Sequence, residues 1–299
     1  MSSADFRRVS SSILFVACAG ACGPIHAATP AIAAPSWSAL RSAYSYKAPA
    51  PTVAEQPLPD PNNLRIHIRF TNIRGQSVPG IFIRPKANGV YPCVLLPHGL
   101  GSDKETMAKY FGGPLASQGV ASLALDSNLH GERKVKDMRP ASSPLALGMV
   151  IHDSVTDYRQ AMDYLATRKD IDSKRIGLLG YSMGAMIGSI TSGVDDRVKA
   201  TVLCVGGDPV KPLVAAFPVA FRMQVEEVSP SNYVGHISPR PVLMINGSHD
   251  TVMNEAAARS LQNAAHTPKE VIWANSGHML PEAELLQAGR WLLKQLDVK

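Results

Sequence analysis

The regular alternation of short apolar runs with longer amphipathic segments is the feature that most constrains this fold. The runs contain few polar residues, as expected of strands that are buried on both faces. They include residues 93–96, 120–126, 175–179 and 201–205. Segments with apolar residues at helical spacing separate them, and two strands of alternating polarity, 64–70 and 78–85, come first. The pattern predicts an α/β fold with a mostly parallel, eight-stranded sheet and helices on both faces.

Polar side chains of catalytic type follow four of the predicted strands. His98, Ser182, Asp250 and His278 each come shortly after one of these strands. Right-handed crossovers bring the carboxyl ends of parallel strands to one edge of a sheet. Open sheets of this kind bind their ligands at that edge. We therefore expect these four side chains to gather there.

The stretch "GYSMGA", residues 180–185, places one serine between two glycines at the end of a predicted strand. A turn sharp enough to point the Ser182 hydroxyl outward would bring Gly180 and Gly184 against the neighbouring backbone, where a side chain would collide. The turn would also place Ser182 at the N-terminus of the next helix. Free backbone N–H groups and the helix dipole favour negative charge at that position.

These residue types suit nucleophilic catalysis. A serine hydroxyl is a weak nucleophile until a base removes its proton, and His278 would serve Ser182 as that base. Asp250 would hold the imidazole in the right tautomer and stabilise its cation. The backbone N–H groups of Leu100 and Met183 would form an oxyanion hole for the tetrahedral intermediate.

The motifs together resemble the α/β-hydrolase superfamily, and within it the dienelactone hydrolases and acetyl xylan esterases. The stretches that carry the resemblance are "PHGLGS", "LALDSNLHGER", "GYSMGA", "INGSHDTV" and "SGHML". The order serine, aspartate, histidine is the chain order of that superfamily's triad. The resemblance implies a serine esterase with a small cap insertion over the site, and a loop held by hydrogen bonds to Asp126. Dienelactone hydrolases proper use a cysteine nucleophile, so Ser182 favours ordinary ester hydrolysis.

Other roles remain open for several of these residues. Asp208 follows the preceding strand and is an alternative acid, while Asp250 could instead cap the next helix. His98 is interpreted as a residue that shapes its loop. A metal site built from His98, Asp126 and His130 has no short-spaced ligand pair to support it. We therefore predict neither a metal nor a cofactor.

The N-terminal segment has the order of a secretory signal. Arg7 and Arg8 precede an apolar stretch, and small residues follow near position 28. We expect a signal peptide at 1–28, a linker or surface segment rich in proline and alanine at 29–63, and a catalytic domain at 64–299. The mature protein would be secreted or periplasmic, with lipid attachment at Cys22 as an alternative.

The composition argues against two classes of partner. The net charge is +6, but the basic residues are scattered and no basic run indicates a nucleic-acid surface. No apolar stretch reaches the roughly 20 residues of a membrane span, so we expect no membrane insertion after signal removal. Cys93 and Cys204 lie in apolar runs and are expected to be buried free thiols. Nothing in the sequence indicates the oligomeric state.

Two segments without strand character would lie over the site, at 128–148 and 208–238. Four apolar residues of the second would form walls of the substrate pocket: Leu213, Phe217, Phe221 and Met223. Because both segments are short, we expect a small or partly open pocket and activity on short-chain carboxylic esters as small-molecule substrates. A serine peptidase of the prolyl-oligopeptidase type and a non-catalytic binding protein are the alternatives.

Overall fold

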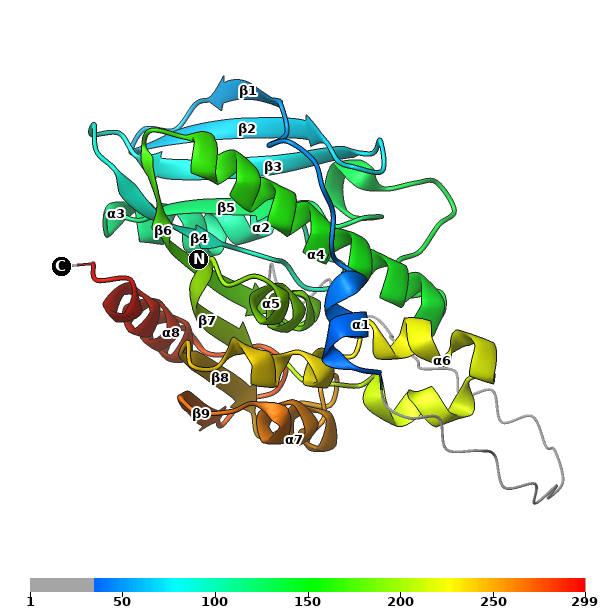
Figure 1. The fold of residues 1–299 in the computed structure, drawn as a ribbon. Helices are drawn as coiled ribbons and strands as arrows, with labels where there is room; N and C mark the ends of the chain where they lie inside the picture. The colour runs from blue at the N-terminus through cyan, green and yellow to red at the C-terminus, as the bar shows by residue number, and fades with distance from the viewer. Residues whose placement is uncertain (1–34, 299) are drawn as a thin grey trace, which may run out of the picture.

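A nine-stranded sheet runs through the computed structural model, which describes residues 35–298. The strand order is β1-β2-β3-β5-β4-β6-β7-β8-β9 (Figure 1). The strands are β1 Val53–Leu58, β2 Asn63–Thr71, β3 Ser77–Pro85, β4 Tyr91–Leu95, β5 Ala121–Leu125, β6 Ile171–Tyr181, β7 Val198–Cys204, β8 Val242–Gly247 and β9 Lys269–Ala274. The pairs β1–β2, β2–β3 and β3–β5 are antiparallel, and every pair from β5 to β9 is parallel. The predicted mostly parallel sheet is confirmed.

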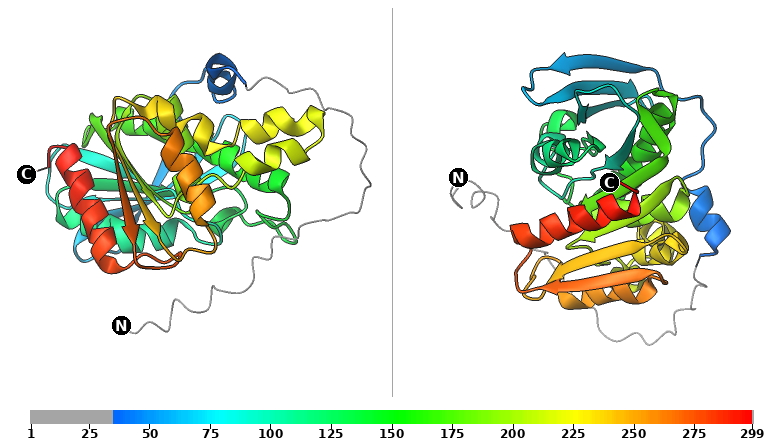
Figure 2. Two further views of the ribbon diagram at one scale, coloured as in Figure 1. Left: turned by 90° about the horizontal axis from the view of Figure 1, so that it is seen from below. Right: turned by 90° about the vertical axis from the view of Figure 1, so that its left-hand side faces the viewer.

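Helices cover both faces of the sheet (Figure 2). One face carries α4 Pro144–Thr167, α5 Met183–Val194 and α7 Glu255–Ala264. The other face carries α8 Glu282–Gln295 and a bent helical stretch made of α2 Lys104–Met107, η1 Ala108–Gly112 and α3 Gly113–Ser117. The remaining elements are α1 Trp37–Ser42, η2 Gly131–Arg133, η3 Lys211–Ala216, α6 Val219–Glu226, η4 Pro230–Asn232 and η5 Val234–Ile237.

Successive residues of β4 enter opposite layers of the core. Leu95 packs in the cluster that contains Ile151 of α4 and Ile187 of α5. Val94 packs in the cluster that contains Leu292 of α8. All five of these side chains are fully buried. Burial of a strand on both faces removes the need for polar alternation, which explains why its sequence is continuously apolar.

The folded domain begins earlier than residue 64, and the sheet has nine strands among the described residues rather than the expected eight. The additional strand, β1, pairs along β2 from Val53 opposite Phe70. Leu40 and Tyr44 are buried, and the Tyr44 hydroxyl donates to the Glu227 carbonyl oxygen at 2.7 Å. Residues 35–63 therefore follow the surface as part of the domain and are not a linker. The predicted signal peptide and Cys22 lie outside the described residues.

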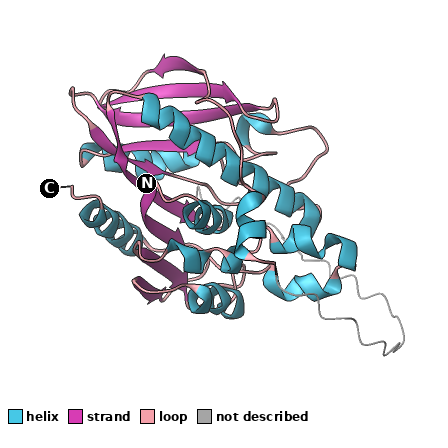
Figure 3. Cartoon of the chain, viewed as in Figure 1, coloured by secondary structure: helices cyan, strands magenta, loops and turns pink. Residues whose placement is uncertain are grey.

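The cap insertion lies between β7 and β8, where η3 and α6 project beside the end of α4 (Figure 3). Cys93 and Cys204 are buried free thiols, as predicted. Between residues 35 and 298, no helix combines the length and the apolar character that a membrane crossing requires.

Candidate active site

Ser182 occupies a strained turn between β6 and α5. Its backbone angles are φ 57° and ψ −117°, in a region that residues with a side chain seldom adopt. A Cβ on Gly180 would lie 2.2 Å from the Gly184 carbonyl oxygen, and one on Gly184 would lie 1.9 Å from the Pro97 carbonyl oxygen. Both contacts are with backbone, which cannot move aside. The turn therefore requires glycine at both positions, as the motif predicted.

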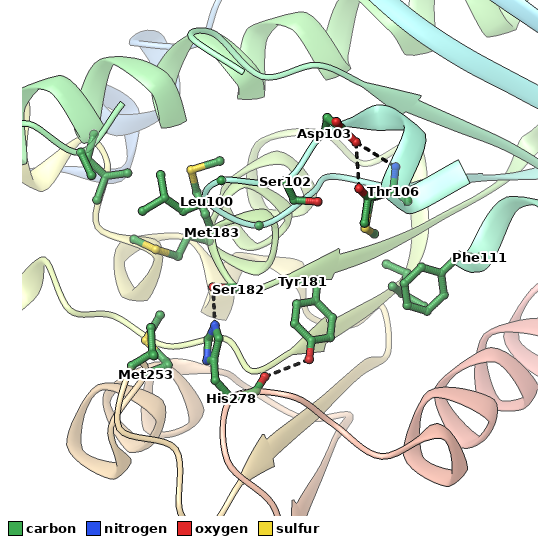
Figure 4. Close-up of a pocket in the computed structure, with 18 of the residues that line it drawn as sticks. Leu100, Ser102, Asp103, Thr106, Phe111, Tyr181, Ser182, Met183, Met253 and His278 are labelled. Carbon is green, nitrogen blue, oxygen red and sulfur yellow. Dashed lines mark hydrogen bonds between the residues drawn. The ribbon is translucent and has the colours of Figure 1, made fainter. Parts of the chain in front are cut away.

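Ser182, His278 and Asp250 form one hydrogen-bonded chain. His278 Nε2 lies 2.9 Å from Ser182 Oγ (Figure 4), and His278 Nδ1 lies 2.7 Å from Asp250 Oδ2. Each residue comes from a different strand end, after β6, β9 and β8 respectively. The Asp250 side chain is only 1% exposed. Because the carboxylate can only accept, Nδ1 carries the proton and Nε2 is free to accept the serine proton.

Asp250 also fixes the turn in which it lies. Its Oδ1 accepts hydrogen bonds from the backbone N–H groups of Val252 at 2.8 Å and Met253 at 2.9 Å. The N-cap of α7 is Asn254, whose side chain accepts from Ala257. Asp250 therefore orients the imidazole and closes its own turn, but it does not cap the helix.

Asp208, the alternative acid, has a different environment. It is buried, and its Oδ1 accepts from the backbone N–H groups of Val210 and Lys211. Its Oδ2 accepts from the Ser229 hydroxyl and the Ser231 N–H. Both oxygens thus hold the base of the cap insertion, and it is Asp250 that the structure places against His278.

The predicted oxyanion hole residues flank Ser182. Leu100 and Met183 line the same cavity as Ser182 (Figure 4). The loop before Leu100 runs directly against the serine, since a Cβ on Gly99 would lie 3.3 Å from Ser182 Cβ. Within residues 35–298, neither the Leu100 nor the Met183 N–H donates to a turn, loop or cap hydrogen bond. Neither N–H group is therefore taken up by such a hydrogen bond, and the oxyanion hole stays a prediction.

The cavity at this site has a volume of about 2620 Å³. Ligand pockets typically measure roughly 300–1,000 Å³, so the expectation of a small pocket is wrong. The alternative of a partly open pocket fits better, because Met149, Met279 and Leu286 line the cavity and are exposed. Leu213 and Phe221 line the cavity as predicted. Phe217 and Met223 are not among its lining residues, and Met223 is 43% exposed. The cap therefore contributes two of the four predicted walls.

Comparison with protein families decides the broad class. A family model described as "Serine hydrolase (FSH1)" matches residues 132–288, which is more than half of the chain. The chain belongs to the serine hydrolase (FSH1) family. The matched part of this serine hydrolase contains Ser182, Asp250 and His278.

Individual relatives are more distant. The chain is 28% identical over 256 residues to the Putative hydrolase YtaP of Bacillus subtilis, covering 74% of this chain and 84% of the relative. It is 29% identical over 160 residues to the Acetyl esterase Axe7A of Xylanibacter ruminicola, covering 48% of this chain and 35% of that protein. The solved acetyl xylan esterase from Paenibacillus sp. R4 superimposes with a TM-score of 0.70 at 18% identity, over 86% of this chain and 92% of that one. The serine hydrolase therefore has the α/β-hydrolase fold that the motifs predicted.

The sequence alone did not single out Tyr181. Its hydroxyl donates to the His278 carbonyl oxygen at 2.9 Å and accepts from the Leu280 N–H at 3.0 Å (Figure 4). Tyr181 thereby fixes the turn that carries the imidazole. The only signal in the sequence is its place beside the serine, where the motif accepts any residue.

Asp126 holds the loop after β5, as the resemblance implied. It is fully buried and accepts from the Lys104 Nζ at 2.9 Å and from the Glu132 N–H at 2.8 Å. Gly131, with φ 51°, passes so close that a Cβ there would lie 2.1 Å from the carboxylate. Within the described part of the chain, no group of three or more histidine, cysteine, aspartate and glutamate side chains could hold a metal ion.

His98 shapes the loop that carries Leu100. Its ring is fully buried, Nδ1 donates to the Gly99 carbonyl oxygen at 2.8 Å, and Nε2 accepts from the Ser127 N–H at 3.0 Å. The pKa of His98 is lowered from 6.5 to about 4, chiefly by burial; the hydrogen bond to Gly99 opposes this shift, and the nearby His130 adds to it. His98 therefore stays neutral at physiological pH and acts as a structural link.

Because His98 is buried in its neutral form, we expect the free energy of unfolding to fall in mild acid. The unfolded chain takes up the proton near pH 6.5, but the folded chain does so only near pH 4. The contribution of His98 is thus complete above pH 6.5 and falls as the pH drops towards 4, by about 3 kcal/mol. Urea unfolding at pH 7.5 and 4.5 should show a steeper fall for the wild type than for His98→Gln. Equal falls would contradict the prediction.

Proposed function

We propose that this serine hydrolase cleaves short-chain carboxylic esters, with Ser182 as nucleophile, His278 as general base and acid, and Asp250 as the orienting carboxylate. The observation that carries the proposal is the continuous hydrogen-bonded chain from the Asp250 carboxylate through His278 to the Ser182 hydroxyl. The hydroxyl belongs to a strained turn at the wall of a large cavity. These are the geometric requirements of an activated serine.

The chemistry follows from that geometry. Ser182 Oγ attacks the ester carbonyl while its proton passes to His278 Nε2, and the resulting oxyanion accepts hydrogen bonds from the Leu100 and Met183 N–H groups. The carbon–oxygen bond to the alcohol then breaks, and the alcohol leaves with the proton from His278. Water repeats the sequence in the second half: it gives a proton to His278, attacks the acyl carbon and releases the acid and Ser182.

Two observations support a short acyl group. Leu213 and Phe221 of the cap are apolar walls of the cavity that contains Ser182, and each helical segment between β7 and β8 has eight residues or fewer. The Xylanibacter ruminicola relative is named an acetyl esterase, although the aligned region spans only about a third of that protein. The order of charged, apolar and small residues within 1–28 supports the further proposal that the enzyme is exported.

A panel of p-nitrophenyl esters tests the acyl preference. Acetate and butyrate should give a kcat/KM at least tenfold above that of palmitate, because the proposed acyl contacts are confined to the cap walls Leu213 and Phe221. The matching p-nitroanilides test the peptidase alternative and should be turned over far more slowly. A best substrate with a long acyl chain, or a faster anilide than ester, would overturn the proposal.

A further inference from the structure

The cavity at Ser182 continues into a groove on the far face of the sheet. Phe111 of η1 and Leu115 of α3 line one side of this groove, and Leu285 and Leu293 of α8 line the other. Tyr181 belongs to the same cavity, and in Figure 4 it lies between Ser182 and Phe111. We call this part of the cavity the α3–α8 groove. Its named walls are apolar, and it is part of the same cavity as the Ser182 hydroxyl.

Gly289 keeps the α3–α8 groove open. It lies in the interior of α8 and lines the cavity, and a Cβ built on it meets no other atom within 4 Å. Glycine in a helix interior is less stable than alanine, so helix formation does not explain this residue. A larger side chain at 289 would project into empty space. The groove therefore has a position where it can be filled without displacing its walls.

The α3–α8 groove adjoins the segment that carries His278, the residue that protonates the leaving alcohol in the proposed reaction. An alcohol can take its proton from His278 only if its oxygen is within hydrogen-bond reach of Nε2. Met279 and Leu280 directly follow that histidine and also line the cavity. An alcohol held at Nε2 can therefore extend along this segment towards α8.

We propose that the α3–α8 groove binds the alcohol part of the substrate, which would be an elongated apolar alcohol of about six carbons or more, or an aromatic one. The inference rests on the proposed ester hydrolysis and adds a substrate class to it. The chemistry of the groove fits such an occupant because leucine and phenylalanine side chains face each other across it, although Lys109, Gln118 and Arg290 also line this part of the cavity. Full burial of a methylene is worth about fourfold in affinity. Because Leu286 at the groove is 51% exposed, we expect about half of that free energy, or about twofold per methylene.

Two series of esters, assayed on the wild type and on variants whose side chain at position 289 fills the groove, test the proposal. The first series varies the alcohol: ethyl, butyl and hexyl acetate. The second varies the acyl group: ethyl acetate, ethyl butanoate and ethyl hexanoate. Release of the acid is followed by titration. In the wild type, kcat/KM should rise about 16-fold from ethyl to hexyl acetate. Gly289→Phe should lower that rise at least fivefold. Gly289→Leu is a second filling variant, and Gly289→Ala is the matched control, since it changes helix propensity with little volume.

Three results of these assays would contradict the inference about the α3–α8 groove. A flat alcohol series in the wild type, an effect of Gly289→Phe on the acyl series, or equal behaviour of Gly289→Phe and Gly289→Ala would overturn the inference. If the wild type hydrolyses none of these esters, the proposed function fails separately. Direct binding of 2-naphthol, followed by its fluorescence, then decides the groove: the inference requires weaker binding to Gly289→Phe than to Gly289→Ala.

Discussion

Ser182→Ala is expected to lower kcat for p-nitrophenyl acetate by a factor on the order of 10⁵–10⁶, because it removes the only atom that attacks the carbonyl. The substitution leaves the strained turn and the hydrogen bond from His278 to Asp250 in place, so the fold should be unaffected. Residual turnover would come from the oxyanion donors alone. Stopped assays with concentrated enzyme, together with thermal unfolding, measure both quantities.

Two controls separate a reactive serine from a general loss of structure. A fluorophosphonate probe should label the wild type and Ser102→Ala, whose hydroxyl also lines the cavity, but not Ser182→Ala. The double variant Ser182→Ala/His278→Ala should be no slower than Ser182→Ala, since the two groups act as one unit. Persistent labelling of Ser182→Ala would show that another residue is the nucleophile. Absence of labelling in the folded wild type would favour a binding protein.

The sheet and the site were predictable because local signals and topology agree. Continuous apolar runs identify strands that are buried on both faces, and parallel topology then brings their carboxyl ends to one edge. Gly180 and Gly184 mark the turn because a Cβ at either position would lie within 2.2 Å of a backbone carbonyl oxygen. Ser182, Asp250 and His278 are distant in sequence, yet the order of strand ends was enough to place them together.

The features that the sequence missed depend on tertiary contacts. Strand β1, "VAEQPL", is an edge strand with four exposed residues, so it has no apolar alternation and is held by backbone pairing with β2. In α6, Phe221 and Met223 are two residues and about 200° apart around the helix, so only one can face the cavity. The cavity is lined by residues of separate elements, such as Leu115 of α3, Met149 of α4 and Leu293 of α8, and no local pattern encodes how these elements are spaced.

Asp250→Asn is expected to lower kcat by a factor on the order of 10⁴ while the protein remains folded. The asparagine oxygen can still accept from the Val252 and Met253 N–H groups, which keeps the turn. Its NH₂ group would then face His278 Nδ1 and require that nitrogen to accept. The proton would move to Nε2, which could no longer take the proton of Ser182.

Asp208→Asn is the matched variant that separates catalysis from folding. Both Asp208 oxygens accept hydrogen bonds from the base of the cap, so an amide there loses acceptors and should lower the free energy of unfolding by about 1–3 kcal/mol. Its kcat should change less than tenfold, because His278 keeps its partner. The two variants are compared by kcat at saturating ester and by urea unfolding. If Asp208→Asn instead shows the large loss of kcat and Asp250→Asn retains activity, the acid has been assigned to the wrong strand end.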